Sequence, residues 1–535
     1  MSMIRNFVLC FALVGFVGCN KGTTPKTPKK ECCKTALKIN ITSEPGTLDP
    51  RKARGLSDIN VIKMFFEGLT RVDCNGSPCC ALAESYDLSE DGRFYTFHLR
   101  ESTWSNGDPL TANDFVYAWK KSLSPNFSSD QAGQLFPIKN AKSIKEGKLP
   151  MSFLGVKALD SKTLAVKLEN PTPYFLDLLA SPVFFPVNAK VDRENPNWAQ
   201  NSQTFVSNGP FNLSEWKHHN QMVAEKNPHY WDKTSVKMGK IEMAMVDEAT
   251  GFSLYENKEL HWEGSPYGVI PTDALSSLKS HEKLQVKPFL GTYWIRVNTE
   301  TAPFNHPGFR RALALAIDRN AIIEHVTQGN QIPALGVVPE SMGLQKTALF
   351  SDHNTSLAKE LFEQTKEELG LKELPEIRLS YANSDRNHRI AQAIQEQWSE
   401  AFGIQIALES TETKVYFDRV RNQDYQLACG SWIADYNDPI NFLEVFASKN
   451  NGTNNTGWEN EEFAAQLEES YTIQDDKARK ELLAKCEAKL VEEMPVMPIF
   501  YFTMLYVQDQ NLQDVVLTET GNLDFKWASF KGDLR

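Results

Sequence analysis

Apolar residues recur along this chain with two different periods, and both periods appear in each half of it. Alternation with a period of two predicts strands. The first begins at residue 37 in LKINITSEPGTLDP, residues 37–50, which ends in a Pro-Gly turn, and residues 94–99, FYTFHL, repeat the pattern. Further strands are predicted at residues 154–156, 163–168, 376–381, 404–408, 425–429 and 499–507.

A second set of segments has the three- and four-residue spacing of amphipathic helices. Thr111 caps a predicted helix that carries Phe115 and Trp119 on one face. Pro307 lies near the start of another, whose apolar face begins at Phe309. Further helices are predicted at residues 59–66, 355–369, 386–402 and 460–493. Because strands and helices are mixed throughout, the class is α/β or α+β and not all-helical.

The amino-terminal segment predicts export. An apolar run from Phe7 to Gly18 is too short to cross a bilayer as a stop-transfer helix, so residues 1–18 are predicted to be a signal peptide. The run ends in FVGC, which resembles a bacterial lipoprotein cleavage box and makes Cys19 the candidate lipidation site. The alternative is an ordinary signal peptide with a chance cysteine. Residues 19–36, rich in Lys, Thr and Pro, are predicted to be a flexible, lipid-anchored tether.

Composition narrows the class of partner. The 535 residues, 41% of them hydrophobic, are enough for a large core and for roughly two to four domains. The net charge of -11 becomes -12 without the signal peptide, which holds one arginine and no acid. Basic stripes with interleaved aromatic residues are absent from the sequence, so nucleic acid is not an expected partner. An acidic exported protein must bind its ligands through local sites.

The nine cysteines and ten histidines do not form a metal motif. Export permits disulfides, and Cys74 could pair with Cys79 or with Cys80. His218 and His219 are adjacent in a predicted strand, where neighbouring side chains point to opposite faces and do not readily share one metal. We therefore expect no metal and no other cofactor. The sequence also lacks H-E-x-x-H, G-x-S-x-G, G-x-x-x-x-G-K-[ST] and G-x-G-x-x-G, which favours binding over catalysis.

One long run carries a family resemblance. Residues 83–119, AESYDLSEDGRFYTFHLRESTWSNGDPLTANDFVYAW, resemble the signature of the extracellular solute-binding proteins, family 5, that serve peptide ABC importers. Four further blocks agree in order: LDP with FEGL at residues 48–50 and 66–69, NGPF at 208–211, PFNHPGFRRALALAIDR at 303–319 and WIADYNDP at 432–439. The resemblance runs from about Leu37 to the C-terminus and is greatest to the oligopeptide-binding group.

The resemblance implies a fold. Such proteins have two lobes that are joined by a hinge and close around the ligand. The fold class is therefore predicted as α/β, of the type II periplasmic-binding-protein kind, with three structural domains, the extra one inserted in lobe one. Domain I is predicted to combine residues 37–75, 204–289 and 503–535. Domain II, residues 76–203, is the insertion, and domain III, residues 290–502, is the second lobe.

The resemblance also implies a ligand site. Asp435 holds the position of the aspartate that pairs with the α-ammonium group of a peptide, and the backbone from Ser431 to Ile433 would bond the peptide as an added strand does. A charge-assisted bond in a partly dry cleft contributes about 1.5 to 3 kcal/mol. A blocked amino terminus would leave this carboxylate unpaired. Three aromatic residues are candidates for the pocket wall or, as is usual for their type, for the core: Trp262, Trp432 and Tyr436.

Two positions depart from the family pattern. Relatives carry a glutamate in the loop after the LDP block and an arginine six residues before the aspartate, where this chain has Arg54 and Cys429. The departure leaves one cation that we expect to be unpaired. Arg54, with Leu56 beside it, is predicted to face the ligand and favour a carboxylate, as in a short or acidic peptide; the alternative is an Arg54 that points to solvent. Further candidates for the carboxyl end of the peptide, each also explained as a surface charge, are Arg386, His388, Arg389, Arg419 and Arg421.

Three functions remain in consideration. The first is a monomeric, non-catalytic lipoprotein, anchored to the periplasmic or cell-envelope face of a membrane, that gives short peptides to ABC permease subunits. The second is the same scaffold with a dipeptide-like, glutathione-like or metal-chelate ligand, favoured by the changes at Arg54 and Cys429. The third is an exported hydrolase that uses Cys429, although no recognisable motif places a histidine beside it.

Overall fold

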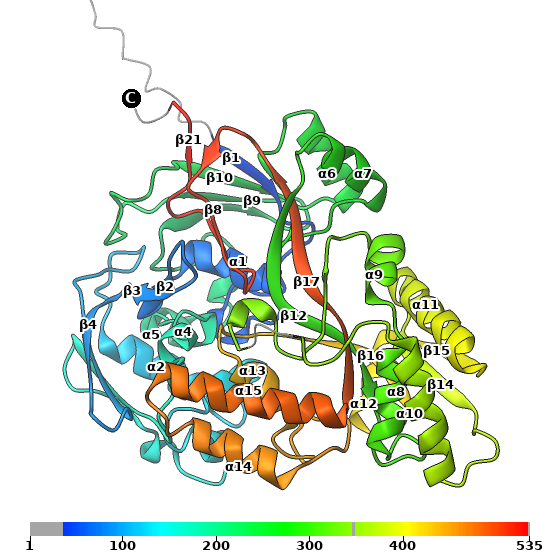
Figure 1. Cartoon of the computed structure of the whole chain (residues 1–535). Coiled ribbons are helices and arrows are strands. Elements are labelled where there is room, and N and C mark those ends of the chain that lie inside the picture. The colour runs from blue at the N-terminus through cyan, green and yellow to red at the C-terminus, as the bar shows by residue number, and fades with distance from the viewer. Residues whose placement is uncertain (1–35, 345–347, 533–535) are drawn as a thin grey trace, which may run out of the picture. The chain divides into compact units, whose positions relative to one another are not determined.

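The computed structural model describes residues 36–344 and 348–532; the predicted signal peptide, most of the tether and Cys19 lie outside them. Among the described residues, eleven strands form one mixed sheet in the order β15-β14-β16-β12-β17-β11-β1-β10-β9-β8, with β13 paired to β17 (Figure 1). These strands are β1 (Leu37–Asn40), β8 (Phe211–Lys217), β9 (Gln221–Lys226), β10 (Lys240–Ala244), β11 (Trp262–Gly264), β12 (Gln285–Val297), β13 (Ile332–Pro333), β14 (Ile377–Ala382), β15 (Ile406–Thr411), β16 (Leu427–Ile433) and β17 (Val496–Gln508).

The long strands β12 and β17 connect the two halves of this sheet (Figure 1). They are antiparallel, and their register shifts between Pro288 and Thr292. Such an irregularity bends a strand pair locally, as a hinge between two lobes requires. The predicted domain boundaries at 289/290 and 502/503 fall within or beside this irregular stretch, and the domain bounds themselves remain predictions.

Each half of the sheet has its own helices. In the half that contains the parallel pair β1 and β10, α6 (Glu248–Glu256) packs against β11, and α6 and α7 (Thr272–Ser280) share an apolar cluster with Val507 of β17. In the other half β16 pairs antiparallel with β12 and parallel with β14. The helices of that half are α8 (Pro307–Leu315), α9 (Arg319–Ala321), α10 (Thr355–Glu368), α11 (Asp385–Phe402), α12 (Thr413–Arg421), α13 (Ile440–Leu443), α14 (Glu461–Ser470) and α15 (Asp476–Glu493).

A separate four-stranded sheet lies within the predicted insertion. Its order is β4-β5-β7-β6, and its strands are β4 (Ala83–Leu88), β5 (Phe94–Leu99), β6 (Val156–Ala158) and β7 (Thr163–Lys167). Its helices are α2 (Ala112–Ser122), α3 (Ala141–Lys145), α4 (Phe175–Leu178) and α5 (Ala189–Glu194). The remaining elements are α1 (Leu56–Phe65), β2 (Thr70–Val72), β3 (Pro78–Cys80), β18 (Leu512–Gln513), β19 (Val516–Leu517), β20 (Leu523–Asp524) and β21 (Ser529–Phe530).

Most predicted elements are present, because their start and stop signals are local. Thr111 caps α2 in a capping box with Asp114, and Gly403, at φ 66°, ends α11. The predicted single helix over residues 460–493 is wrong, because it is two helices. The side chain of Asp475 accepts a hydrogen bond from the Ala478 amide and starts α15 anew, so the apolar period continues across a break.

Two further expectations are corrected. His218 and His219 follow β8 in a turn instead of lying in a strand, and both approach Glu44, with Nδ1 to carboxylate oxygen distances of 2.6 and 2.8 Å. The described cysteines, which include Cys74, Cys79 and Cys80, are all free thiols, so the loop disulfide that the sequence allows is not formed. In the described ranges, every helix is too short or too polar to span a membrane.

Candidate functional site

Segments that are distant in the sequence surround a cavity of about 300 Å³, which lies at the lower end of the range for ligand pockets. Its wall comes from the loop before α1, from α1 itself, from the insertion, from the irregular stretch of β12 and from the end of β16. Half of the lining residues are apolar, and the other half are polar or charged. The residues that line it are Ala53, Arg54, Leu56, Ile59, Lys63, Gln131, Gln134, Ser181, Pro182, Val183, Phe289, Ile433, Ala434, Asp435, Thr520 and Asn522.

Asp435 faces this cavity from the loop after β16. Its Oδ1 accepts a 3.4 Å hydrogen bond from Gln134 Nε2, and its amide donates to Asn441 Oδ1 at 3.3 Å. Asn441 also accepts from Trp432 Nε1 at 2.9 Å, which fixes the loop. The carboxylate is open to the cavity, but the protein around it raises the pKa of Asp435 by burial, and the Gln134 bond offsets part of that shift. A cation in the cavity would stabilise the ionised form.

The next residue, Tyr436, makes a contact between the predicted insertion and the predicted second lobe. Its ring stacks on Tyr174 with centroids 4.2 Å apart and planes 7° apart. Its hydroxyl donates a 2.7 Å bond to Glu444, whose pKa is raised to about 7, mainly by burial. Asp438 forms a bidentate pair with buried Arg479 at 2.7 and 2.9 Å. Tyr436 therefore positions the Asp435 loop and does not line the cavity itself.

The strand before the aspartate has a partly open edge. β16 pairs with β12 along its length, whereas β14 reaches the first two residues of its other edge. The Ser431 carbonyl oxygen accepts a 3.2 Å hydrogen bond from Arg296 Nη2. A Cβ at Gly430 would lie 1.7 Å from Arg296 Nη1, so the guanidinium crosses the strand where there is no side chain. Arg296 thus occupies part of the predicted peptide-binding edge, and Ile433 is the part that lines the cavity.

Arg54 and Leu56 both line the cavity, and the Arg54 side chain is also open to solvent, which is the alternative that the sequence leaves open. The expectation that Arg54 is unpaired is wrong, because its Nε lies 2.7 Å from Asp130 Oδ2. The Arg54 side chain is 80% exposed, so this pair is solvated and its charges are screened. The sequence could not reveal the partner, since Asp130 is in the predicted insertion.

Three other candidate residues lie away from the cavity lining. Cys429 is buried, and burial raises the pKa of its thiol to about 12. Trp262 is buried in β11 and stacks on Tyr506 with ring centroids 4.3 Å apart. Arg421, at the end of α12, points to solvent and pairs with Asp418 at 2.9 Å.

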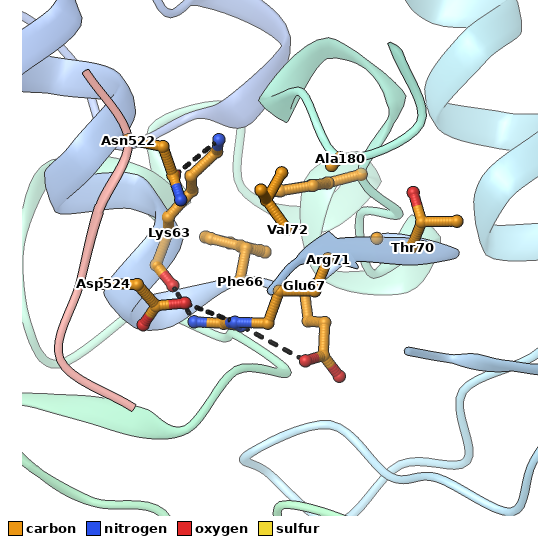
Figure 2. A pocket seen from close by; sticks show the side chains of 11 residues that line it. Lys63, Phe66, Glu67, Thr70, Arg71, Val72, Ala180, Asn522 and Asp524 are labelled. Atoms are coloured by element: carbon orange, nitrogen blue, oxygen red, sulfur yellow. Dashed lines mark hydrogen bonds and ion pairs between the residues drawn. The ribbon is translucent and has the colours of Figure 1, made fainter. Parts of the chain in front are cut away.

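Lys63 is the main cavity residue that sequence reasoning missed. It lies on the same face of α1 as Leu56 and Ile59, because residues three, four and seven apart share a helix face, and this spacing was the available signal. Its Nζ donates a 2.8 Å hydrogen bond to Asn522 Oδ1 (Figure 2). The cavity therefore holds an ammonium group as well as the Asp435 carboxylate.

Comparison with known proteins gives the family. The model of the bacterial extracellular solute-binding proteins, family 5 Middle, matches residues 79–454. The oligopeptide-binding protein OppA of Bacillus subtilis (strain 168) is 43% identical over 540 residues, which covers 99% of each chain.

Solved structures of similar proteins have the same fold as the chain. The unliganded open form of MppA, a periplasmic murein tripeptide binding protein, has a TM-score of 0.80 at 28% identity, covering 93% of this chain and 97% of its own. Listeria monocytogenes OppA bound to peptide has a TM-score of 0.75 at 28% identity, covering 93% and 99%. The predicted fold class, α/β of type II with two lobes, is confirmed. The chain belongs to the bacterial extracellular solute-binding proteins, family 5.

Proposed function

We propose that this protein is the substrate-binding component of an ABC importer, which captures short oligopeptides in the cavity beside Asp435 and delivers them to permease subunits in the membrane. The observation that carries the proposal is the Asp435 carboxylate, which faces the cavity with one long hydrogen bond from a neutral amide. The names of its relatives, which include oligopeptide- and murein-tripeptide-binding proteins, support the same ligand class.

The geometry suits recognition of a peptide amino terminus. An α-ammonium group beside Asp435 replaces the weak Gln134 bond with a charge-assisted one, worth about 1.5 to 3 kcal/mol. The part of the β16 edge that neither β14 nor Arg296 occupies offers main-chain groups to an extended ligand. Binding through main-chain groups does not depend on the side chains of the ligand. Water in the cavity adapts to different side chains. Sequence tolerance thus follows from main-chain recognition.

Catalysis is not part of the proposal. A hydrolase that uses Cys429 needs a thiolate, and burial raises the pKa of this thiol to about 12. The alternative of a dipeptide-like, glutathione-like or metal-chelate ligand rested on Arg54 and Cys429. Arg54 pairs with Asp130 and Cys429 lies in the core, so neither residue favours it.

The proposed protein is a monomer on the outer side of a membrane, held there by lipid on Cys19 through the tether of residues 19–36. The FVGC cleavage box supports this anchor. A Cys19→Ser variant should move from the membrane fraction to the soluble fraction, and mass spectrometry of the mature amino terminus should find a diacylglyceryl cysteine in the parent protein. An unmodified parent terminus would contradict the anchor.

Mass spectrometry of ligand that co-purifies with the protein tests the function directly. Unblocked peptides of a few residues are expected, and calorimetry with defined tri- to pentapeptides should then show binding to the ligand-free protein. Recovery of a ligand class without free amino termini, together with no heat from any of these peptides, would contradict the proposed function.

A further inference from the structure

The cavity contains a second charged group whose role the peptide amino terminus does not explain. Lys63 lies on the same face of α1 as Leu56 and Ile59, and all three line the cavity. Its ammonium group has three N–H donors, and one of them bonds to Asn522 Oδ1 at 2.8 Å. Figure 2, which shows a neighbouring pocket that Lys63 and Asn522 also line, draws the two side chains pointing toward each other. The acceptor is a neutral amide, so the charge of Lys63 is not matched there.

Two carboxylates of the neighbouring pocket that Lys63 also lines are paired with another cation. Arg71 forms ion pairs with both of them (Figure 2). Its Nε lies 2.6 Å from Asp524 Oδ2, and its Nη1 lies 3.2 Å from Glu67 Oε1. Glu67 accepts a further bond from Tyr230 at 2.5 Å. Among residues 36–344 and 348–532, no carboxylate oxygen lies within 4.0 Å of Lys63 Nζ. Lys63 is therefore a half-buried cation without an anionic partner in that part of the chain.

Hydrogen bonds from a neighbouring residue hold the part of α1 that carries Lys63 against the turn with Asn522. Asn60, one turn before Lys63, donates to the Gly521 carbonyl at 2.9 Å and accepts from the Leu523 amide at 2.7 Å. These bonds hold the turn that carries Asn522 against α1. Gly521 has φ +78°, and a Cβ there would lie 2.7 Å from Leu56 Cδ2, so this close approach needs glycine. The turn thus presents the Lys63 ammonium group at the cavity wall.

We propose that Lys63 binds a carboxylate of the ligand, so that the cavity selects ligands with an anionic group. The inference rests on the proposed function, because Asp435 and Lys63 line one cavity from different parts of the chain and together match a ligand that carries both charges. The carboxylate has two sources in a peptide: its C-terminus or an acidic side chain. Arg54 is the weaker candidate for this role, since it is already paired with Asp130.

The number of protons taken up on binding distinguishes a lysine that contacts the ligand from one with a structural role. Burial lowers the pKa of Lys63 to about 8, with Asp524 opposing and Arg71 adding to the shift. Glu67 is bonded to Arg71, and Asp435 lies on the same cavity. A bound carboxylate favours the charged lysine and raises its pKa. Binding at pH 8 should therefore take up protons.

Calorimetry with three probes separates the sources: Ala-Ala-Ala, its C-terminal amide, and Ala-Glu-Ala amide. In Lys63→Gln we expect roughly a ten- to hundredfold loss of affinity for the probe that carries the recognised carboxylate and little change for Ala-Ala-Ala amide. A loss with Ala-Ala-Ala assigns the C-terminus, and a loss with Ala-Glu-Ala amide assigns a side chain. Lys63→Arg should retain most of the affinity.

Lys52→Gln is the matched control, because it removes the same charge from an exposed lysine near the cavity that does not line it. It should leave all affinities unchanged. The α-amino group of each probe, with an ordinary pKa of about 8, also takes up protons at pH 8 when it binds as an ammonium group. Titrations at pH 8 in buffers of different ionisation enthalpy should therefore show proton uptake that Lys63→Gln reduces by the share of the lysine and that Lys52→Gln leaves unchanged. An equal loss for all three probes in Lys63→Gln, or no loss, would overturn the Lys63 inference while the parent protein still binds peptide. A parent protein that binds none of the probes would contradict the proposed function itself.

Discussion

The Nε2 atom of Gln134 donates a 3.4 Å hydrogen bond to Asp435 Oδ1 and so connects residues 301 positions apart in the sequence. The bond is long, and its donor is neutral. The surrounding protein raises the pKa of Asp435 by burial and this bond opposes the shift, while the carboxylate stays open to solvent in the cavity. We therefore expect the proposed site to favour a ligand with a cation, because a ligand without one would leave the carboxylate desolvated and unpaired.

Peptide affinity should rise with pH as Asp435 ionises. The raised pKa means that ligand-free protein holds a proton on this carboxyl at a higher pH than an ordinary aspartate does. A peptide ammonium group lowers that pKa again, so binding releases protons in mildly acidic buffer. Titration calorimetry in buffers of different ionisation enthalpy measures the release. Asp435→Asn should abolish it, and a release that persists in this variant would assign the proton to another group.

Removing Arg51 should destabilise the fold. Its guanidinium is buried and bonds Asp192 at 2.6 and 2.8 Å and Asp49 at 2.7 and 2.9 Å, which holds the loop before α1. Arg51→Met leaves two buried carboxylates without their cation, so the free energy of unfolding should fall by about 3 to 5 kcal/mol. Chemical denaturation measures it. Arg54→Gln, which breaks an exposed pair, should cost about 1 kcal/mol or less, and equal losses would refute this difference.

Glu444→Gln should stabilise the protein at pH 8. Burial, Asp435 and Asp438 raise the pKa of Glu444 to about 7, and the Tyr436 bond opposes the shift. The folded protein therefore binds more protons here than the unfolded chain between about pH 4.5 and 7, and stability is lost as pH rises through that window. The glutamine keeps an oxygen that accepts from Tyr436 but carries no charge.

The expected gain is about 1 to 3 kcal/mol in the free energy of unfolding at pH 8 and close to none at pH 5. Urea denaturation at both pH values measures it. Glu461→Gln, at an exposed position in the first turn of α14, serves as the control and should show no such pH-dependent gain. A variant that loses stability equally at pH 5 and pH 8 would contradict the assignment.

Gly430→Ala should disturb the strand edge beside the site. The new Cβ would lie 1.7 Å from Arg296 Nη1, so the guanidinium must leave the Ser431 carbonyl. Because the end of a flexible side chain can move aside, we expect a loss of about 1 kcal/mol in the free energy of unfolding, the value of the hydrogen bond given up. Gly452→Ala meets nothing within 4 Å and should be nearly neutral. Thermal unfolding of the two variants measures the difference. A Gly430→Ala variant as stable as the parent would show that Arg296 moves without cost.

Local signals made much of the fold predictable. Thr111 and Gly403 mark helix ends by side-chain and backbone chemistry that needs no distant partner. The break before α15 was missed because Asp475 starts a new helix while the charged, amphipathic pattern continues. The domain bounds at 289/290 and 502/503 came from the family resemblance and stay predictions, since no period reveals which strands two lobes share.

The site was less predictable, because its partners come from far along the chain. The position of Asp435 followed from its motif, but its contact with Gln134 and the pair of Arg54 with Asp130 depend on tertiary packing. Aromatic residue type was a poor guide, since Trp262 is in the core. The spacing of Lys63 from Leu56 places both on one face of the helix, but the local sequence does not indicate which face lines the cavity.

Calorimetric titration of Ala-Ala-Ala and its N-acetylated form into the parent protein and into Asp435→Asn tests the central claim most directly. The parent should bind the free peptide roughly ten- to a hundredfold more tightly than the acetylated one, because the free ammonium group alone pairs with Asp435. Asp435→Asn should bind both forms with similar, weaker affinity. Equal affinities in the parent, or a preference for the free amine that survives in Asp435→Asn, would contradict the account.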